Sequence, residues 1–429
     1  MARALELRFT DREITPWGGL VLMHRMLDKI RFQDALDTLD LPPQLSNRGH
    51  SPHDLITQYL IGVWCGATRF EHLEVTRHDH ALCKIFDFKR MAGHRAFVRY
   101  FDKFTLETNS RVFQGLYRWL FGNIVFDNFT LDLDSTVITR YGEQEGARRG
   151  YNPQKRGRLS HHPLMAFVSD IRMVANCWLR AGDAHTANNF ECFLNETLVN
   201  LSGKRVGLLR ADSGFCSDSI MRYLEGRQIE YIIAARLHPK IQRMLVAHRV
   251  WARVSEGIDV AETEHKGRRM IMVRQRVKER PKATGKTLRL FADDEEIAGY
   301  RYGCYMTSLG LPAVEVWRLY RGRADAENRI KELKGDFGLE GFCVRGFSAT
   351  EAAMNFAMLG YNLMSLFRQA VVCKTVHHTL KTLRYKVFAV GGYVTKDGSR
   401  RILRLALAMK RRRWFEGLWS KSGDSHRTA

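Results

Sequence analysis

Residues 320–339, YRGRADAENRIKELKGDFGL, form a charged segment in which one carboxylate has an unusual setting. On a helix that advances about 100° per residue, four side chains share an arc of about 60°: Tyr320, Arg323, Glu327 and Lys334. The neighbouring acids fall on the opposite side. A solvated helix face with an Arg–Glu pair four residues apart explains two of these side chains. It does not explain the tyrosine and the second cation, so the spacing favours Glu327 as a functional carboxylate.

Two aspartates lie on one predicted strand far upstream. In FTLDLDST, residues 129–136, apolar residues alternate with Asp132 and Asp134, so both acids share one face. Two buried like charges repel each other and lose hydration, and a bound cation would relieve that cost. A solvent-facing edge strand with ordinary aspartates fits the pattern equally well. Asp134, at the strand end, is the better candidate for a metal ligand.

A second apolar strand, in RVGLLRADSGF, ends in Asp212, and Gly214 then turns the chain toward a helix. In open α/β sheets, ligands bind outside the carboxyl ends of the strands. An aspartate in a turn is also common for purely structural reasons. Asp212 alone therefore does not distinguish a ligand from a structural turn residue, and it becomes a candidate ligand only together with Asp134 and Glu327.

The order of elements predicts a mixed α/β sheet. Residues 123–237 read as three strands, a helix, a strand, a helix and a strand. Residues 1–120 read as mostly helical, either a bundle with a solvated basic face or a DNA-binding module. Four regions follow: 1–120, a helical DNA-binding region; 121–237 with 311–370, the catalytic α/β domain; 238–310, a β-rich insertion; and 371–429, a basic C-terminal region.

The composition favours a polyanionic partner. The 429 residues include 68 Lys and Arg against 46 Asp and Glu, a formal charge of +22, while 45% of residues are apolar. Eight cysteines without a C-x-x-C pair predict buried thiols in a reducing compartment and exclude zinc-finger spacing. The sequence shows no signal-like apolar core near its start and no membrane-length apolar run, so we expect a cytoplasmic protein.

The pattern Y-x2-R-x3-E-x6-K, together with LDLDSTV and LLRADSGF, resembles the three blocks of DDE transposases of the insertion-sequence 4 group. The stretches LDLDSTVITRYGEQEGARRGYNP and YRGRADAENRIKELKGDFGL are most similar to 1380-type insertion sequences. The resemblance covers roughly residues 120–370, and its second block departs from the plainer forms of the group. It implies a ribonuclease-H-like mixed sheet with a β-rich insertion and a helical N-terminal DNA-binding region.

This resemblance also implies an activity. The expected function is cut-and-paste transposition, in which the protein cleaves the ends of its own insertion sequence and transfers the strands to target DNA. Asp134, Asp212 and Glu327 would be both the catalytic residues and the ligands of two Mg²⁺ ions, with Mn²⁺ as a substitute. The expected partners are double-stranded DNA, carrying the terminal inverted repeats or the target, and a second copy in a homodimer. Two alternatives stay open: a DNA-binding regulator with a decayed core, and a metal-dependent nuclease without strand transfer.

Several further residues are candidates for DNA contacts. Tyr320, Arg323 and Lys334 are expected to bind the backbone of a DNA end. A basic stretch after the first block is either a backbone clamp or a disordered solvated loop: Arg148, Arg149, Lys155, Arg156 and Arg158. Trp251 and Trp317 either stack on an unpaired base or pack in the core. His161 and His162 are expected to be structural or to contact DNA rather than to bind metal.

Overall fold

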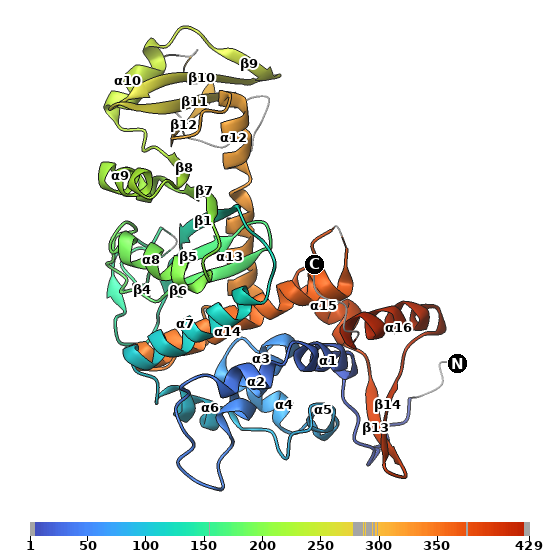
Figure 1. Ribbon diagram of the computed structural model, residues 1–429. Helices are drawn as coiled ribbons and strands as arrows, with labels where there is room; N and C mark the ends of the chain where they lie inside the picture. Colours follow the sequence, from blue (N-terminus) through green and yellow to red (C-terminus); the bar gives the residue numbers. More distant parts are fainter. Residues whose placement is uncertain are drawn as a thin grey trace. The chain divides into compact units, whose positions relative to one another are not determined.

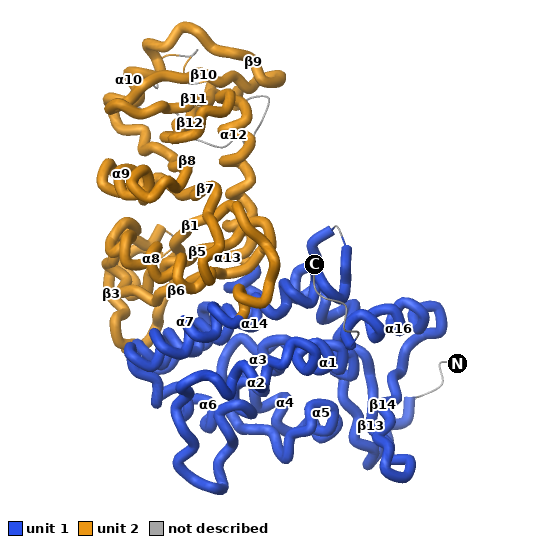
Figure 2. Tube along the Cα trace, in the orientation of Figure 1, with its two compact units in different colours: residues 1–119, 332–429 blue, residues 120–331 orange. Residues whose placement is uncertain are grey.

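The computed structural model describes residues 5–153, 155–277, 299–374 and 376–423, together with the single residues 286, 288, 294 and 297. The chain divides into two compact units, which Figure 2 shows in different colours. Unit 1 combines residues 1–119 with 332–429, and unit 2 is residues 120–331. The acids that end the two predicted strands, and Glu327, all belong to unit 2.

Unit 2 is built on a nine-stranded sheet with the order β6-β5-β1-β7-β8-β12-β11-β10-β9. Its strands are β1 (Phe129–Ser135), β5 (Leu164–Val168), β6 (Met173–Trp178), β7 (Val206–Ala211), β8 (Glu230–Ala234), β9 (Ala252–Ser255), β10 (Ile258–His265), β11 (Arg268–Arg276) and β12 (Tyr300–Thr307). β1, β7 and β8 run parallel, and β5 runs antiparallel between β1 and β6. The first five strands thus have the predicted ribonuclease-H-like arrangement, and the predicted fold class is confirmed.

The position of β1 explains its composition. It lies inside the sheet between β5 and β7, so it is not the edge strand that the sequence also allowed. Phe129, Leu131 and Leu133 are buried on one face, because a period of two places every second side chain there. Asp132 and Asp134 are buried on the other face, where each carboxylate needs a compensating partner.

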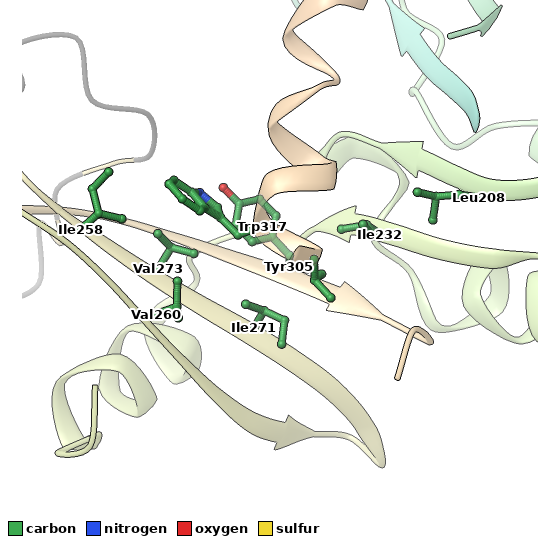
Figure 3. Close-up of a cluster of buried hydrophobic side chains, with 9 residues drawn as sticks. Leu208, Ile232, Ile258, Val260, Ile271, Val273, Tyr305 and Trp317 are labelled. Atoms are coloured by element: carbon green, nitrogen blue, oxygen red, sulfur yellow. The ribbon is translucent and has the colours of Figure 1, made fainter. Parts of the chain in front are cut away.

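The residues between β8 and α12 extend the main sheet. β12 pairs antiparallel with β8, and β11, β10 and β9 follow as an antiparallel meander (Figure 1). A cluster of buried side chains joins the two parts of the sheet: Leu208 and Ile232 from the parallel strands lie with Ile258, Val260, Ile271, Val273, Tyr305, Val316 and Trp317 (Figure 3). This core anchors α12 on the extended sheet.

The helices of unit 2 follow from clear local signals. They are α8 (Phe190–Asn200), α9 (Asp218–Gly226), α10 (Pro239–Ala247) and α12 (Ala313–Arg321), with a short 3₁₀ turn at Ser213–Phe215. Ser217 caps α9 by accepting a hydrogen bond from the Ile220 N–H, as its sequence position predicts. A small separate sheet has the order β2-β4-β3, from Ile138–Thr139, Leu159–His161 and Arg148–Arg149.

The region predicted as one helix across residues 320–334 is two helices, so the single helical wheel was wrong. α12 ends at Arg321 and α13 (Ala324–Asp336) begins after a turn at Gly322 and Arg323. Glycine disfavours a helix interior, which is the local reason for a break at this position. The turn directs Arg323 into unit 2 instead of along a shared helix face.

Unit 1 is mostly helical. Its elements are α1 (Val21–Lys29), α2 (Phe32–Asp37), α3 (Pro52–Cys65), α4 (Glu74–Arg77), α5 (His80–Ile85), α6 (His94–Phe101), α14 (Phe347–Phe367), α15 (Leu380–Leu383) and α16 (Met409–Gly423), with 3₁₀ turns at Gly18–Leu20 and Phe70–Leu73, π-helical turns at Arg368–Val372 and Arg384–Phe388, and a hairpin of β13 (Gly392–Asp397) and β14 (Arg400–Leu405). α7 (Leu106–Gly122) and α13 cross the unit boundary. The apolar α14 is buried along most of its length and packs on α3, where Tyr59 and Trp64 donate to backbone carbonyls of α14.

Candidate active site

Asp134 and Asp212 lie at the ends of adjacent parallel strands. Leu133 of β1 is in register with Ala211 of β7, so the next residue of each strand is one of the two acids. Neighbouring strands are about 4.8 Å apart, which brings these two backbone positions together despite their separation in sequence. Asp134 is 7% exposed, and Asp212 is half-buried and accepts a hydrogen bond from the Gly214 N–H at 2.9 Å.

Arg323 bonds directly to the first of these acids. Its guanidinium Nη2 lies 3.0 Å from Asp134 Oδ2, and both side chains are almost fully buried. The same Nη2 donates to the Leu133 carbonyl at 3.4 Å. The turn between α12 and α13 makes this approach possible, since Arg323 is the residue at which the helical path is interrupted. The sequence-predicted DNA contact therefore has an internal carboxylate partner.

Glu327 belongs to the same electrostatic neighbourhood. The pKa of Asp134 is raised to about 6, chiefly by burial, with contributions from the negative charges of Asp212 and Glu327 and an opposing contribution from Arg323. Glu327 follows Arg323 by four residues on α13 and is exposed. The charges of Asp212, at the end of β7, and of Glu327, on α13, thus both act on the buried carboxylate of Asp134, although the three residues are far apart in sequence.

A cavity of about 650 Å³ lies beside these acids. Its lining includes Glu327, Arg323, Tyr320 and Ser213, the last of which directly follows Asp212. Basic and aromatic residues complete it: Arg236, His238, Lys286, Tyr302, Tyr305 and Arg321. The Tyr320 ring lies 4.3 Å from that of Tyr305, and burial raises the pKa of Tyr320 to about 12. The cavity therefore combines cations, aromatic faces and a tyrosine that stays protonated at neutral pH.

A buried ion cluster, missed by the sequence reasoning, holds the strand that carries Asp134. Arg210 Nε donates to Asp132 Oδ1 at 2.6 Å and its Nη2 to Oδ2 at 2.9 Å. Arg210 also donates to Ser169 Oγ at 3.0 Å and to the Leu319 carbonyl. Arg329 Nη1 lies 3.8 Å from the same Asp132 carboxylate. One guanidinium thus connects β1, which carries Asp134, β7, which precedes Asp212, and the end of α12, which precedes the helix of Glu327.

The oxygen atoms of the three candidate acids are of the kind that a hard divalent cation binds. Asp134, Asp212 and Glu327 offer carboxylate oxygens only, which are the ligands that Mg²⁺ prefers. Among the described residues, no three His, Cys, Asp or Glu side chains are close enough together to hold an ion as they stand. The Arg323 guanidinium instead supplies the positive charge at Asp134. The ligand types fit, and in this structure Asp134 Oδ2 is paired with Arg323.

The five cations of the predicted basic clamp are exposed, and two of them form a strand. Arg148 and Arg149 form β3, and Arg148 pairs with Asp183 at 3.2 Å, so the alternative of a disordered loop is wrong there. Lys155 contacts the Tyr141 hydroxyl, and it is exposed, like Arg156 and Arg158. These five cations face solvent, and their role in DNA binding stays a prediction.

Lys334, the last residue of the motif, lies seven positions after Glu327 on α13. Its Nζ is 2.8 Å from Glu340 Oε1. Its predicted contact with DNA stays a prediction.

The two histidines have structural partners. His161 is fully buried, with Arg140 Nε donating to its Nδ1 at 3.0 Å and the Glu145 carbonyl 2.9 Å from its Nε2. His162 lies 2.9 Å from the Ala184 carbonyl and 3.1 Å from Ser135 Oγ. Burial lowers the pKa of both rings, to about 4 for His161. Of the two predicted roles, the structural one fits these contacts.

The two candidate tryptophans differ in burial. Trp317 is 3% exposed within the core cluster, so it packs in the core and is not available to stack on a base. Trp251 is half-buried, donates to the His248 carbonyl at 3.1 Å and has the Arg274 guanidinium 4.7 Å from its ring centroid.

The cysteine thiols also differ in burial. All eight cysteines are described, and none of them forms a disulfide bond. Cys83, Cys177 and Cys304 are buried as predicted, while Cys192 and Cys373 are exposed.

Comparison with known families identifies the chain. The family model described as "Transposase DDE domain group 1" matches residues 1–421. The chain belongs to this transposase family. This confirms the DDE transposase resemblance.

Among solved structures, the piggyBac transposase in a synaptic complex with hairpin DNA is similar to this transposase. The identity is 14% and the TM-score 0.46, over 88% of this chain and 81% of that chain. No curated protein matches this transposase. No helix in the described part of the chain has the length and apolar character that are needed to cross a membrane.

Proposed function

We propose that this transposase cleaves the ends of its own mobile element and joins them to target DNA, in a cut-and-paste reaction that depends on divalent metal. The observation that carries the proposal is the register of β1 and β7, which aligns Asp134 with Asp212, together with the electrostatic effect of Glu327 on Asp134. We further propose that the element is of the 1380 type within the insertion-sequence 4 group, on the basis of the three sequence blocks.

Asp134, Asp212 and Glu327 are the proposed ligands. Two Mg²⁺ ions, for which Mn²⁺ can substitute, supply an activated water and stabilise the leaving oxygen when bound. Asp134 and Asp212 are positioned by adjacent strands, whereas Glu327 is exposed on α13.

Arg323 is proposed to exchange partners. In the DNA-free chain its guanidinium neutralises Asp134, which otherwise would be a nearly buried anion. A phosphate of the DNA end has two unesterified oxygens that a guanidinium can bind in place of a carboxylate, so it can take the guanidinium over. Tyr320, which stays protonated at neutral pH, then donates a hydrogen bond to the backbone from the same cavity wall.

The proposed substrate is double-stranded DNA, in line with a formal charge of +22. The cations of the cavity and the exposed residues Arg148, Arg149, Lys155, Arg156 and Arg158 are the proposed backbone contacts, together with Lys334. We propose the regions 1–120, 121–237 with 311–370, 238–310 and 371–429 as the DNA-binding, catalytic, inserted and basic C-terminal regions. Two element ends must be paired, so we propose a homodimer on DNA, acting in a bacterial cytoplasm or nucleoid.

The test uses the full chain and a duplex that carries one end of the element, defined by the inverted repeats that flank the gene. Asp134→Ala, Asp212→Ala and Glu327→Ala are expected to abolish Mg²⁺-dependent cleavage by at least about a thousandfold while duplex binding persists. A matched control, Asp325→Ala, removes a neighbouring acid of α13 whose carboxylate pairs with Arg172 and should leave cleavage intact. Full cleavage by Glu327→Ala would refute the assignment.

The same assay separates the alternatives. Joined products in the presence of target DNA exclude a nuclease without strand transfer. Binding without any cleavage or joining, with either Mg²⁺ or Mn²⁺, would favour the regulator with a decayed core.

A further inference from the structure

The segment LELRF, which begins at Leu5, leaves three large apolar side chains in solvent. Leu5, Leu7 and Phe9 are 101%, 80% and 92% exposed. They alternate with Glu6 and Arg8, so in an extended conformation the apolar side chains share one face and the two charges share the other. Within the described part of the chain, the backbone N–H and C=O groups of these five residues have no hydrogen-bond partner. An alternating segment with an open backbone has the character of a strand that lacks a neighbour.

The neighbouring strand of the same chain is too short to pair with the LELRF segment. Thr15 forms an antiparallel bridge with Gly392 of β13, and the N–H···O distances are 2.9 Å in both directions. If this register continues, each residue before Thr15 lies opposite a residue further along β13, and Thr10 lies opposite Asp397. Asp397 is the last residue of β13, so the five residues before Thr10 would extend past the end of the strand. The segment therefore requires a partner other than β13.

The LELRF segment is complementary to a second copy of itself. When two copies run antiparallel with a two-fold axis at Leu7, Leu5 lies opposite Phe9. In the same register Glu6 lies opposite Arg8, so every charge meets its opposite on one face and three apolar pairs form on the other. In the single chain, Arg8 donates to the Glu6 carboxylate at 2.9 and 3.0 Å. Both side chains are exposed, so this ion pair contributes little and can be exchanged for the pair between copies.

Neighbouring registers of the same two strands are less favourable. A shift of one residue places each apolar side chain opposite a charged one, because successive side chains point to opposite faces. A shift of two residues moves the two-fold axis to Glu6 or to Arg8, and that residue then lies opposite its own counterpart. Like charges directly opposite each other destabilise a strand pair. Within this segment, the register about Leu7 is therefore the one that satisfies both faces.

We propose that the LELRF segments of two copies form an antiparallel β-ribbon, with Leu7 at the two-fold axis. The inference rests on the proposed function in one respect, the homodimer, and it names a surface through which the two copies meet. Pairing covers part of the exposed apolar surface and gives the open backbone groups hydrogen-bond partners. The ribbon needs neither DNA nor metal.

The experiment traps the ribbon with a disulfide, because five residues per copy bury less surface than a stable interface needs. Leu7→Cys is made in the full chain together with Cys192→Ser and Cys373→Ser, which remove the exposed native thiols. The protein is oxidised with diamide, without DNA or metal. Leu7→Cys should form covalent dimers at least about tenfold faster than the matched control Glu6→Cys, because residue 7 lies opposite its own counterpart whereas residue 6 lies opposite Arg8. Both substituted side chains are exposed, so both variants should keep the wild-type melting temperature.

A charge exchange tests the register. In the Leu7→Cys background, Glu6→Arg or Arg8→Glu alone places like charges opposite each other and should slow the cross-linking. A mixture of these two variants restores opposite charges at both pairs, so mixed dimers should exceed the half that random pairing produces.

Three results would overturn the proposal. The first is an equal rate of cross-linking for Leu7→Cys and Glu6→Cys, and the second is random pairing in the mixture. The third is a disulfide that joins residues 7 and 403 in preference to two copies of residue 7 in Leu7→Cys with Leu403→Cys, which would assign the segment to the outer edge of β14. Because cleavage is not scored, each of these results would leave the cleavage proposal standing.

Discussion

The substitution Arg210→Met tests the buried ion cluster that supports the three acids. Arg210 and Asp132 are 5% and 0% exposed, and two hydrogen bonds of 2.6 and 2.9 Å join them. Without the guanidinium, the Asp132 carboxylate retains Arg329 at 3.8 Å, which is beyond hydrogen-bonding distance. Breaking a buried pair by removing one partner costs about 3–5 kcal/mol. That is a large part of the roughly 5–15 kcal/mol that stabilises a folded domain.

The assay is urea unfolding followed by tryptophan fluorescence, with a double-mutant cycle. Asp132→Asn removes the buried negative charge, so Arg210→Met combined with Asp132→Asn should lose less stability than the sum of the single variants, by about 2 kcal/mol. Arg253→Met is the matched control, because Arg253 is exposed and its partner Asp259 keeps Arg274 at 2.8 Å. The control should lose less than about 1 kcal/mol. If Arg210→Met behaves like the control, or if the two substitutions are additive, the cluster does not brace β1.

Three further comparisons examine the surroundings of the site. Gly322→Ala would place a Cβ 2.6 Å from Arg210 Nη1, so it should displace that guanidinium and lower the stability of the protein by about 1–3 kcal/mol. Gly335→Ala on α13, which has open space around the new Cβ, should stabilise the protein instead. Thermal melting that ranks the two variants the other way would contradict this reasoning. Trp317→Ala should cost about 3–5 kcal/mol of unfolding free energy and Trp251→Ala less, and equal losses would count against core packing of Trp317. The neutral, buried His161 ring contributes its full stabilisation of the fold above pH 6.5. This contribution is lost as the pH falls toward 4, because the ring in the unfolded chain gains a proton at a higher pH than the buried ring does. Unfolding free energy should therefore fall by about 2 kcal/mol more in the wild type than in His161→Gln between pH 7 and pH 5, and parallel profiles would refute the assignment.

Much of unit 2 could be predicted from sequence because its signals are local. The alternation in FTLDLDST and the apolar run before Asp212 define strands, and the ends of parallel strands meet at one edge of a sheet. The order of strands and helices up to residue 237 then leaves few topologies, and the ribonuclease-H-like arrangement is one of them.

The remaining features depend on contacts between distant residues. Arg323 and Asp134 are nearly two hundred positions apart, and no periodicity records their pairing. The extension of the sheet through β12 is also a distant pairing. Two local signals were present but were not used: Gly322 inside the helical pattern, and Arg210 within an otherwise apolar strand. A buried arginine requires an acid partner, and Asp132 was the available one.

The most direct test of the central claim replaces one proposed ligand with a thiol. Asp134→Cys should bind the end duplex, fail to cleave it in Mg²⁺ and regain measurable cleavage in Mn²⁺, because a thiolate is a poor ligand for Mg²⁺ and a better one for Mn²⁺. Cys192 and Cys373 are the exposed native thiols, so the wild type in both metals is the necessary control. Unchanged cleavage by Asp134→Cys in Mg²⁺ would contradict the claim that Asp134 holds a catalytic metal ion.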